Sequence, residues 1–145
     1  MQDFLISVGN DATKPTLVRR NLSEVIESIQ EDKRIESLIS RIRLLPTKNE
    51  RNKLKIQLPY FNLGLFEPDY RKNDNFHSTE FFLFDVDGLN EIQIAVLKLS
   101  LRLDKTVFMF FVSPSGNGLK IVYRLDRPII TEEEYAQNYI YYAEQ

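Results

Sequence analysis

The hydrophobic positions of the chain follow two different spacings, which separate expected helices from expected strands. Between residues 25 and 42 aliphatic residues recur every three or four positions around a polar break at 31–33, which predicts one interrupted helix or two short ones. Residues 81–86 form an unbroken apolar run apart from one acid, which is typical of a strand covered on both faces. The spacing therefore predicts both helices and strands in this chain.

The second half of the chain predicts an antiparallel hairpin between two helices. Apolar runs at 107–112 and 119–125 flank the turn sequence SPSGNG, which favours two strands joined by a short loop. Asn90 can cap a helix over residues 91–103, and Thr131 with Glu134 has the pattern of a capping box for a last helix. Residues 4–8 and 54–58 also predict strands, and the sequence predicts a long aromatic and polar loop over residues 60–78.

The strand FFLFDVDG ends on two carboxylates. Alternate residues of a strand share a face, so Asp85 and Asp87 project together, about 6.6 Å apart along the backbone. Crowded carboxylates repel each other unless a cation lies between them, and Mg²⁺ is typically held by one or two carboxylates and substrate phosphates. The alternative is a solvated Asp-Val-Asp-Gly turn without a ligand.

The loop of the expected hairpin has the composition of a phosphate-binding loop. Glycines let backbone amides approach a ligand, and consecutive amides can form an anion-binding concavity. Its candidate nucleotide-binding residues are Ser113, Ser115, Gly116, Gly118 and Lys120. If the hairpin neighbours the acidic strand, carboxylates face phosphate donors across a cleft, which suits phosphoryl or nucleotidyl transfer. The alternative is a turn whose glycines serve only the backbone.

A basic segment interrupts a chain whose formal net charge is only −2. It spans residues 41–55 and contains one acid, Glu50. Such a segment could lie along the phosphates of a nucleic acid, or it could be a solubilising surface. The residues that we single out as candidate nucleic-acid contacts are Arg41, Arg43, Lys53 and Lys55.

Composition narrows the chemistry that remains. The 145 residues fit one domain, and 43% hydrophobic with 28% charged residues is ordinary for a soluble globular protein. The absence of cysteine excludes disulfides and thiolate metal sites. The single histidine, His77, argues against multi-histidine zinc sites, and we expect it to have a structural role. With no leader or membrane-spanning pattern in the sequence, we expect a cytoplasmic protein.

Two motifs together resemble a known superfamily. FFLFDVDG followed by FVSPSGNGLKIVYRL is similar to the hydrophobic-DxD motif and the following Ser/Gly-rich motif of the archaeo-eukaryotic primase superfamily, which includes primase-polymerases. More narrowly, the chain resembles the primase-like N-terminal domain of virulence-associated E proteins of mobile elements. LPYFNLGLF and the HS before the acidic strand share this likeness, which spans about residues 54–125.

The resemblance implies an RRM-like, mainly antiparallel sheet flanked by helices beside an N-terminal α/β unit. It implies one domain over residues 1–145 that is the N-terminal part of a larger catalytic domain or protein. The implied activity is metal-dependent nucleotidyl transfer in the replication of mobile-element DNA, with Mg²⁺ or Mn²⁺ at Asp85 and Asp87 and nucleotide phosphates near Ser113, Ser115 and Lys120. The implied partners are nucleoside triphosphates, single-stranded DNA or RNA, and a helicase domain in the same or a neighbouring chain.

The chain departs from the superfamily pattern at two points. Many primases have histidine in the second motif, where this chain has Lys120, and a third acidic motif follows further downstream. Asp126 and residues 132–134 come too soon to supply that motif. Two alternatives therefore stay open: a non-catalytic nucleic-acid-binding module, and a haloacid-dehalogenase-like phosphatase, whose DxDG motif also follows an apolar strand. A helix with parallel strands after Ser113 would favour the phosphatase hypothesis, and a hairpin would favour the primase-like hypothesis.

Overall fold

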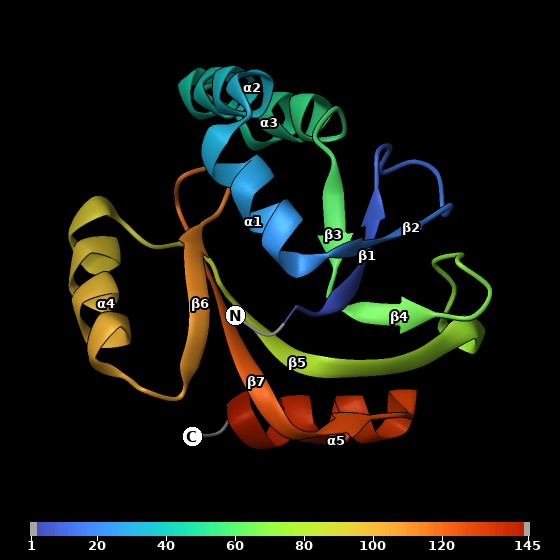
Figure 1. The fold of residues 1–145 in the computed structure, drawn as a ribbon. Helices are drawn as coiled ribbons and strands as arrows, with labels where there is room; N and C mark the ends of the chain where they lie inside the picture. The colour runs from blue at the N-terminus through green and yellow to red at the C-terminus, as the bar shows by residue number, and fades with distance from the viewer. Residues whose placement is uncertain (1–2, 144–145) are drawn as a thin grey trace.

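A computed structural model of the chain describes residues 3–143 and has an α+β fold (Figure 1). Its elements, in chain order, are β1 (Leu5–Gly9), β2 (Val18–Asn21), α1 (Leu22–Glu31), α2 (Lys33–Leu44), α3 (Lys48–Lys55), β3 (Tyr60–Asn62), β4 (Gly64–Phe66), the short 3₁₀ helix η1 (Asn73–Asn75), β5 (Phe76–Val86), α4 (Glu91–Leu103), β6 (Val107–Val112), β7 (Leu119–Ile129) and α5 (Glu132–Ala143).

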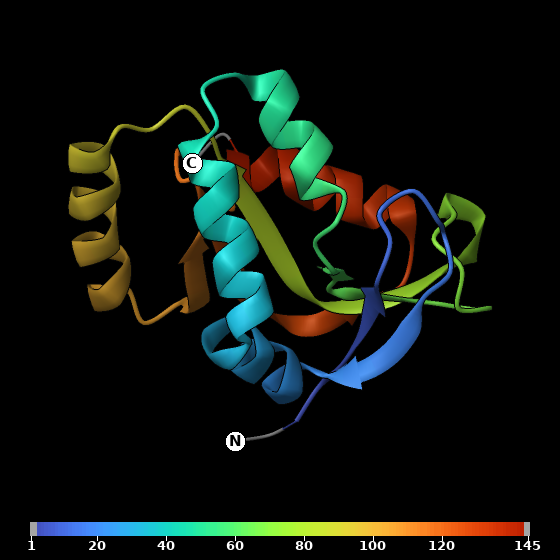
Figure 2. The same cartoon turned by 90° about the horizontal axis from the view of Figure 1, so that it is seen from above.

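The strands form two antiparallel sheets, which confirms the expected fold class of a mainly antiparallel sheet flanked by helices. The smaller sheet has the order β2-β1-β3 and belongs to the N-terminal unit with α1, α2 and α3. The larger sheet has the order β4-β5-β7-β6. Figures 1 and 2 show α4 beside β6 and α5 along the curved strands β5 and β7.

The long strand β5 is covered on both faces, as its apolar run predicts. Phe81 packs in a buried cluster with residues of β1, α1 and β7, and Leu83 lies against the same cluster. On the opposite face, Phe82 contacts the ring of Tyr139 in α5 at 5.7 Å between centroids. The face that carries Phe81 and Leu83 is called the inner face below, and by strand alternation the next position on it is Asp85.

The interrupted helix resolves into α1 and α2, and α3 replaces an expected strand. Asn21 precedes α1 but makes no side-chain capping bond. The strand expected over residues 54–58 is wrong, because residues 54 and 55 end α3. A capping box between Thr47 and Glu50 starts that helix, and its signal lies upstream of the short apolar alternation that suggested a strand.

Three short strands were not expected from the sequence. The strand β2 is polar and lies at an edge, while β3 and β4 lie within the predicted long loop and have three residues each. The strand β3 pairs with β1, which is distant in sequence, while β2 pairs with β1 and β4 with β5 across loops of about ten residues. The sequence pattern is weak here because a three-residue strand is too short to show a period.

The helix α4 and the β6–β7 hairpin follow the sequence closely. Asn90 and Gln93 form a capping box at the start of α4. The strands β6 and β7 pair in antiparallel fashion around residues 113–118, which confirms the predicted hairpin. The second strand passes through Pro128 to Ile129, although it pairs with β5 there at Thr79 alone. None of the described helices is long and apolar enough to cross a membrane.

Candidate functional site

Two carboxylates lie at the end of β5, and strand alternation places Asp85 on the inner face of the larger sheet. Asp85 is the penultimate residue of the strand, and Asp87 follows its last residue. In the register between β5 and β7, Asp85 lies opposite Lys120. The Lys120 ammonium donates a hydrogen bond to Oδ2 of Asp85, and both side chains stay accessible at 28% and 38% exposure. The predicted carboxylate and the predicted phosphate-binding lysine are therefore direct neighbours.

The same cross-strand row continues into β6. Phe111 lies opposite Lys120, so Asp85, Lys120 and Phe111 follow one another across three strands. The ring of Phe61, at the centre of β3, packs against Phe111 at 5.9 Å between centroids. An aromatic wall therefore stands next to the charged pair.

The loop between β6 and β7 is held in one conformation by its own backbone. The Ser113 amide donates to the Gly118 carbonyl at 2.9 Å, and the Gly116 amide donates to the Ser113 carbonyl at 2.9 Å. Gly116 has a φ of +81°, which glycine adopts without the strain that a side chain would bring. The Leu89 amide donates to the Asn117 carbonyl at 2.8 Å, which ties the loop to the segment after Asp87.

Gly118 lets the loop lie directly on the end of β5. A Cβ at this position would lie 2.6 Å from the Val86 carbonyl oxygen and 2.9 Å from Oδ1 of Asp87. It would also lie 3.3 Å from Oγ of Ser113, which is 4% exposed. The Asp87 carboxylate and the Ser113 hydroxyl therefore flank the same small space.

Polar groups of the loop are available to an anion. Ser115 Oγ donates to Asn117 Oδ1 at 2.7 Å and lies 3.3 Å from Ser113 Oγ. The backbone amides of Ser115, Asn117 and Gly118 donate no hydrogen bond within the part of the chain that the structure describes. Amides without an acceptor in a glycine-containing turn are the groups that bind phosphate in backbone concavities.

Arg43 reaches this loop from α2. Its Nη2 donates to the Ser113 carbonyl at 3.3 Å, and its side chain packs on Gly116, where an added Cβ would lie 3.3 Å from Nε. The site thus has two cations, Arg43 and Lys120, beside the carboxylates of Asp85 and Asp87. The four charges balance, and a ligand with both negative phosphates and a divalent cation suits such a set.

The donor set fits a hard cation only with the help of a ligand. No group of three or more His, Cys, Asp or Glu side chains that could hold a metal is present among residues 3–143. Asp85 and Asp87 are two carboxylates, and the Ser113 hydroxyl lies beside Asp87. Because Mg²⁺ is commonly bound by one or two carboxylates, with phosphates and water completing its shell, these residues fit Mg²⁺ or Mn²⁺ bound together with a phosphorylated ligand.

A comparison with sequence families places the larger sheet and its helices in a known group. The model of the family described as "BT4734-like, N-terminal domain" matches residues 53–145, which is more than half of the chain. The chain belongs to the BT4734-like N-terminal domain family. No curated protein and no solved structure matches it.

The BT4734-like match includes both carboxylates and the whole hairpin. It begins near the end of α3, so β1, β2, α1 and α2 lie outside it. Arg43, which contacts the hairpin, is therefore supplied by the N-terminal unit outside the matched region.

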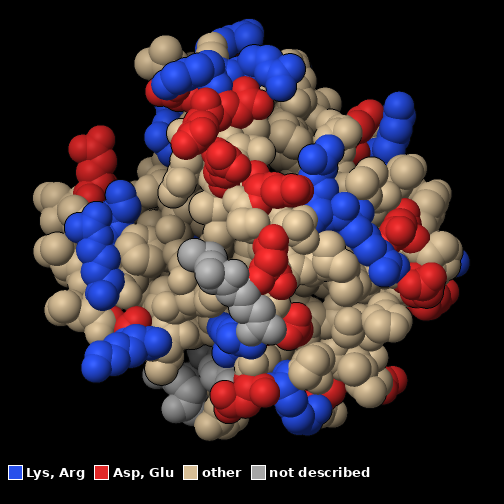
Figure 3. Space-filling view, viewed as in Figure 1, with Lys and Arg blue, Asp and Glu red and all other residues tan. Residues whose placement is uncertain are grey.

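The rest of the basic segment lies away from the hairpin. Arg51 donates to the carbonyls of Leu45 at 2.9 Å and Pro46 at 3.3 Å, beyond the end of α2. Arg41 is an exposed residue of α2, and Lys53 and Lys55 lie in the last turn of α3. In Figure 3, basic side chains gather over α2 and α3, above a band of acidic side chains over α1. His77 lies at the opposite end of β5 and bonds Ser78, so it takes no part in the site.

Three residues of the site carried no clear sequence signal. Asn117 lies between the two glycines of the loop, and this position is the only sequence feature that indicates a role for it in the site. Phe61 and Phe111 look like ordinary core residues in the sequence. Their contact joins β3 to β6, and sequence spacing alone does not encode that approach.

Proposed function

We propose that this domain binds a nucleoside triphosphate together with Mg²⁺ or Mn²⁺ and acts as the nucleotide-binding part of a primase-polymerase-like nucleotidyltransferase. The observation that carries the proposal is the meeting of the two motifs: Asp85 and Asp87 end one strand, and Ser113 and Lys120 bound the adjoining hairpin. Single-stranded DNA or RNA is the proposed template, and replication of mobile-element DNA in the cytoplasm, with a helicase domain as partner, is the proposed setting.

The phosphates of the nucleotide would bind at the hairpin. The amides of Ser115 and Asn117 and the Lys120 ammonium supply donors, and Arg43 adds a second cation that the loop already holds. Charged donors to phosphate are stronger than neutral ones because both partners contribute to the attraction. A divalent cation supplies charge neutralisation between the phosphates when it is bound with the nucleotide.

The Lys120–Asp85 pair makes binding of metal and nucleotide mutually dependent. With the ammonium bonded to Asp85, a metal ion alone has to compete with a cation that is already in place. A triphosphate attracts Lys120 and releases the Asp85 carboxylate for the metal. Each ligand should therefore bind more tightly in the presence of the other.

One alternative gains weight from the structure and another loses it. The two-carboxylate set favours the alternative of a nucleic-acid-binding module without turnover, because no third acidic ligand joins Asp85 and Asp87 among the described residues. The phosphatase alternative requires a helix and parallel strands after Ser113. The antiparallel hairpin observed there argues against it.

Mn²⁺ titration of isotope-labelled protein tests the proposal. We expect paramagnetic broadening to begin at residues 85–88 and 113–120 only when a nucleoside triphosphate is present. In the double variant Asp85→Ala/Asp87→Ala this broadening should disappear, and nucleotide affinity measured by calorimetry should fall at least tenfold, about 1.4 kcal/mol.

The matched control removes the same charge elsewhere. The double variant Asp74→Ala/Glu133→Ala changes two exposed acids outside the site and should bind Mn²⁺ and nucleotide as the unmodified protein does. Equal binding by both double variants would refute the metal site. A separate assay of template-directed incorporation distinguishes a working enzyme from a binding module.

A further inference from the structure

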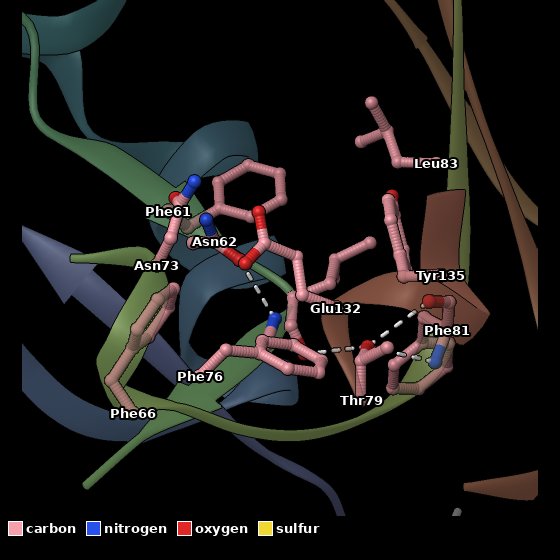
Figure 4. A pocket seen from close by; sticks show the side chains of 12 residues that line it. Phe61, Asn62, Phe66, Asn73, Phe76, Thr79, Phe81, Leu83, Glu132 and Tyr135 are labelled. Carbon is pink, nitrogen blue, oxygen red and sulfur yellow. Dashed lines mark hydrogen bonds between the residues drawn. The ribbon is translucent and has the colours of Figure 1, made fainter. Parts of the chain in front are cut away.

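A cavity of about 320 Å³ lies along β5 on the side of Leu83, two residues before Asp85, and the proposed phosphate site does not use it. It is bounded by β3 and β4, by η1, by β5 and by the start of α5. The structure lines it with Phe61, Asn62, Leu63, Gly64, Phe66, Asn73, Phe76, Thr79, Phe81, Leu83, Glu132 and Tyr135. Figure 4 shows the rings of Phe66 and Phe76 on one side and those of Phe81 and Tyr135 on the other.

The cavity exists because β5 loses its partner strand. The short strand β4 pairs with β5 over residues 76–79, and β7 covers only the other edge of β5. Beyond Thr79 no described strand pairs with the free edge of β5. Side chains of β3 and α5 line this space, and burial raises the pKa of Tyr135.

The lining combines aromatic walls with a few polar groups. Five of its side chains are aromatic, and ring faces bind flat, conjugated ligands by stacking. Asn62 Oδ1 accepts from the Gly64 amide at 2.8 Å, which leaves its NH₂ group as a donor. The Glu132 carboxylate forms no hydrogen bond or ion pair with the described residues and is available as an acceptor. A flat ring with both acceptors and donors on its edge matches this lining.

Two lining residues of the cavity lie close to the carboxylate site. Leu83 lines it and precedes Asp85 by one step on the inner face, about 6.6 Å along the strand. Phe61 lines it as well and packs on Phe111, which lies in the row of Lys120 and Asp85. A ligand with phosphates at the hairpin and a ring in the cavity would therefore pass across Phe61 and Leu83.

We infer that this cavity binds the nucleobase of the nucleotide whose phosphates bind the hairpin. The inference rests on the proposed function and adds to it the part of the nucleotide that the phosphate site leaves undescribed. Base stacking on aromatic side chains tolerates all bases, while Asn62 and Glu132 provide a means to distinguish their edges.

Nucleosides and inorganic tripolyphosphate separate the two halves of the site. The protein is titrated in amide-resolved NMR experiments with each ribonucleoside and deoxyribonucleoside, and separately with tripolyphosphate and Mg²⁺. Nucleosides should shift the amides of Gly64, Thr79 and Leu83, whereas tripolyphosphate should shift those of the 113–120 hairpin. Asn73→Trp, at an exposed lining position, should fill the cavity and weaken nucleoside binding at least tenfold while leaving tripolyphosphate binding unchanged.

The neighbouring residue provides the control. Asp74→Trp places the same ring on an exposed position of η1 that does not line the cavity, and nucleoside binding should persist. Absence of nucleoside shifts in the cavity, or an equal loss in both tryptophan variants, overturns the inference even if tripolyphosphate binds. Binding of nucleosides without tripolyphosphate binding overturns the proposed function and, with it, the assignment of the cavity to the base of a nucleotide.

Discussion

The polar groups of the β6–β7 hairpin lie close together, whereas the basic residues of α2 and α3 contact different parts of the molecule. In the hairpin, Lys120 bonds Asp85, and the loop lies against Asp87. In the basic segment, Arg43 contacts the hairpin, and Arg51 bonds carbonyls at the end of α2. Positive charge alone therefore does not define a common binding surface in this molecule.

The difference follows from backbone geometry. An antiparallel ladder sets each residue beside a fixed partner, so groups on one face of neighbouring strands must meet. A helix turns by about 100° per residue, so Arg41 and Arg43 face nearly opposite directions although they are two positions apart. Cations that are neighbours in the sequence of a helix therefore face different directions, while charged residues that are distant in sequence lie side by side on paired strands.

The largest effect should come from disrupting the close contact between the hairpin and β5. In Gly118→Ala the new methyl group would lie 2.6 Å from the Val86 carbonyl, so the loop has to move away from Asp87. We expect the free energy of unfolding to fall by about 2 kcal/mol in denaturant melts. Gly88→Ala is the control, since its φ of +72° brings strain but no atom lies within 4 Å. An equal or smaller loss for Gly118→Ala would contradict the close contact.

The second effect concerns the charged pair. Lys120→Met keeps the length of the side chain but removes its charge, so nucleoside triphosphate with Mn²⁺ should bind about tenfold more weakly, or about 1.4 kcal/mol. Mn²⁺ alone should bind more tightly, because Asp85 no longer has a competing cation. Calorimetry measures both, with exposed Lys105→Met as the control. Unchanged nucleotide affinity would remove Lys120 from the phosphate site.

The smallest effect should distinguish structural from binding cations in the basic segment. Arg51→Gln loses the bonds to the carbonyls of Leu45 and Pro46 and should lower the free energy of unfolding by about 1 kcal/mol.

Lys53→Gln should leave the free energy of unfolding unchanged. If Lys53 contacts one phosphate, this variant should reduce the log–log slope of single-strand affinity against salt concentration by about 0.7. Fluorescence anisotropy at several salt concentrations measures that slope. The opposite pattern would reverse the two roles.

Several elements could be predicted because their signals are local. The capping box of Asn90 and Gln93 marks the start of α4, and the turn sequence between residues 113 and 118 marks the hairpin. The capping box of Thr47 and Glu50 is equally local but was not identified from the sequence, and the short apolar alternation in residues 54–58 led to the wrong prediction of a strand there. The strands β3 and β4 could not be predicted, because three residues are too few to show a period and β3 pairs with the distant strand β1.

For the candidate site, the sequence by itself determined that Asp85 and Asp87 lie at the end of one strand and that Ser113 and Lys120 border one turn, because strand periodicity and hairpin geometry act over a few residues. Only the tertiary structure decided that Lys120 bonds Asp85 and that Arg43 reaches the loop. It also decided that the free edge of β5 borders an aromatic cavity. These contacts join residues 35 or more positions apart or surfaces of several elements, so they depend on how the sheets and helices pack rather than on any local pattern.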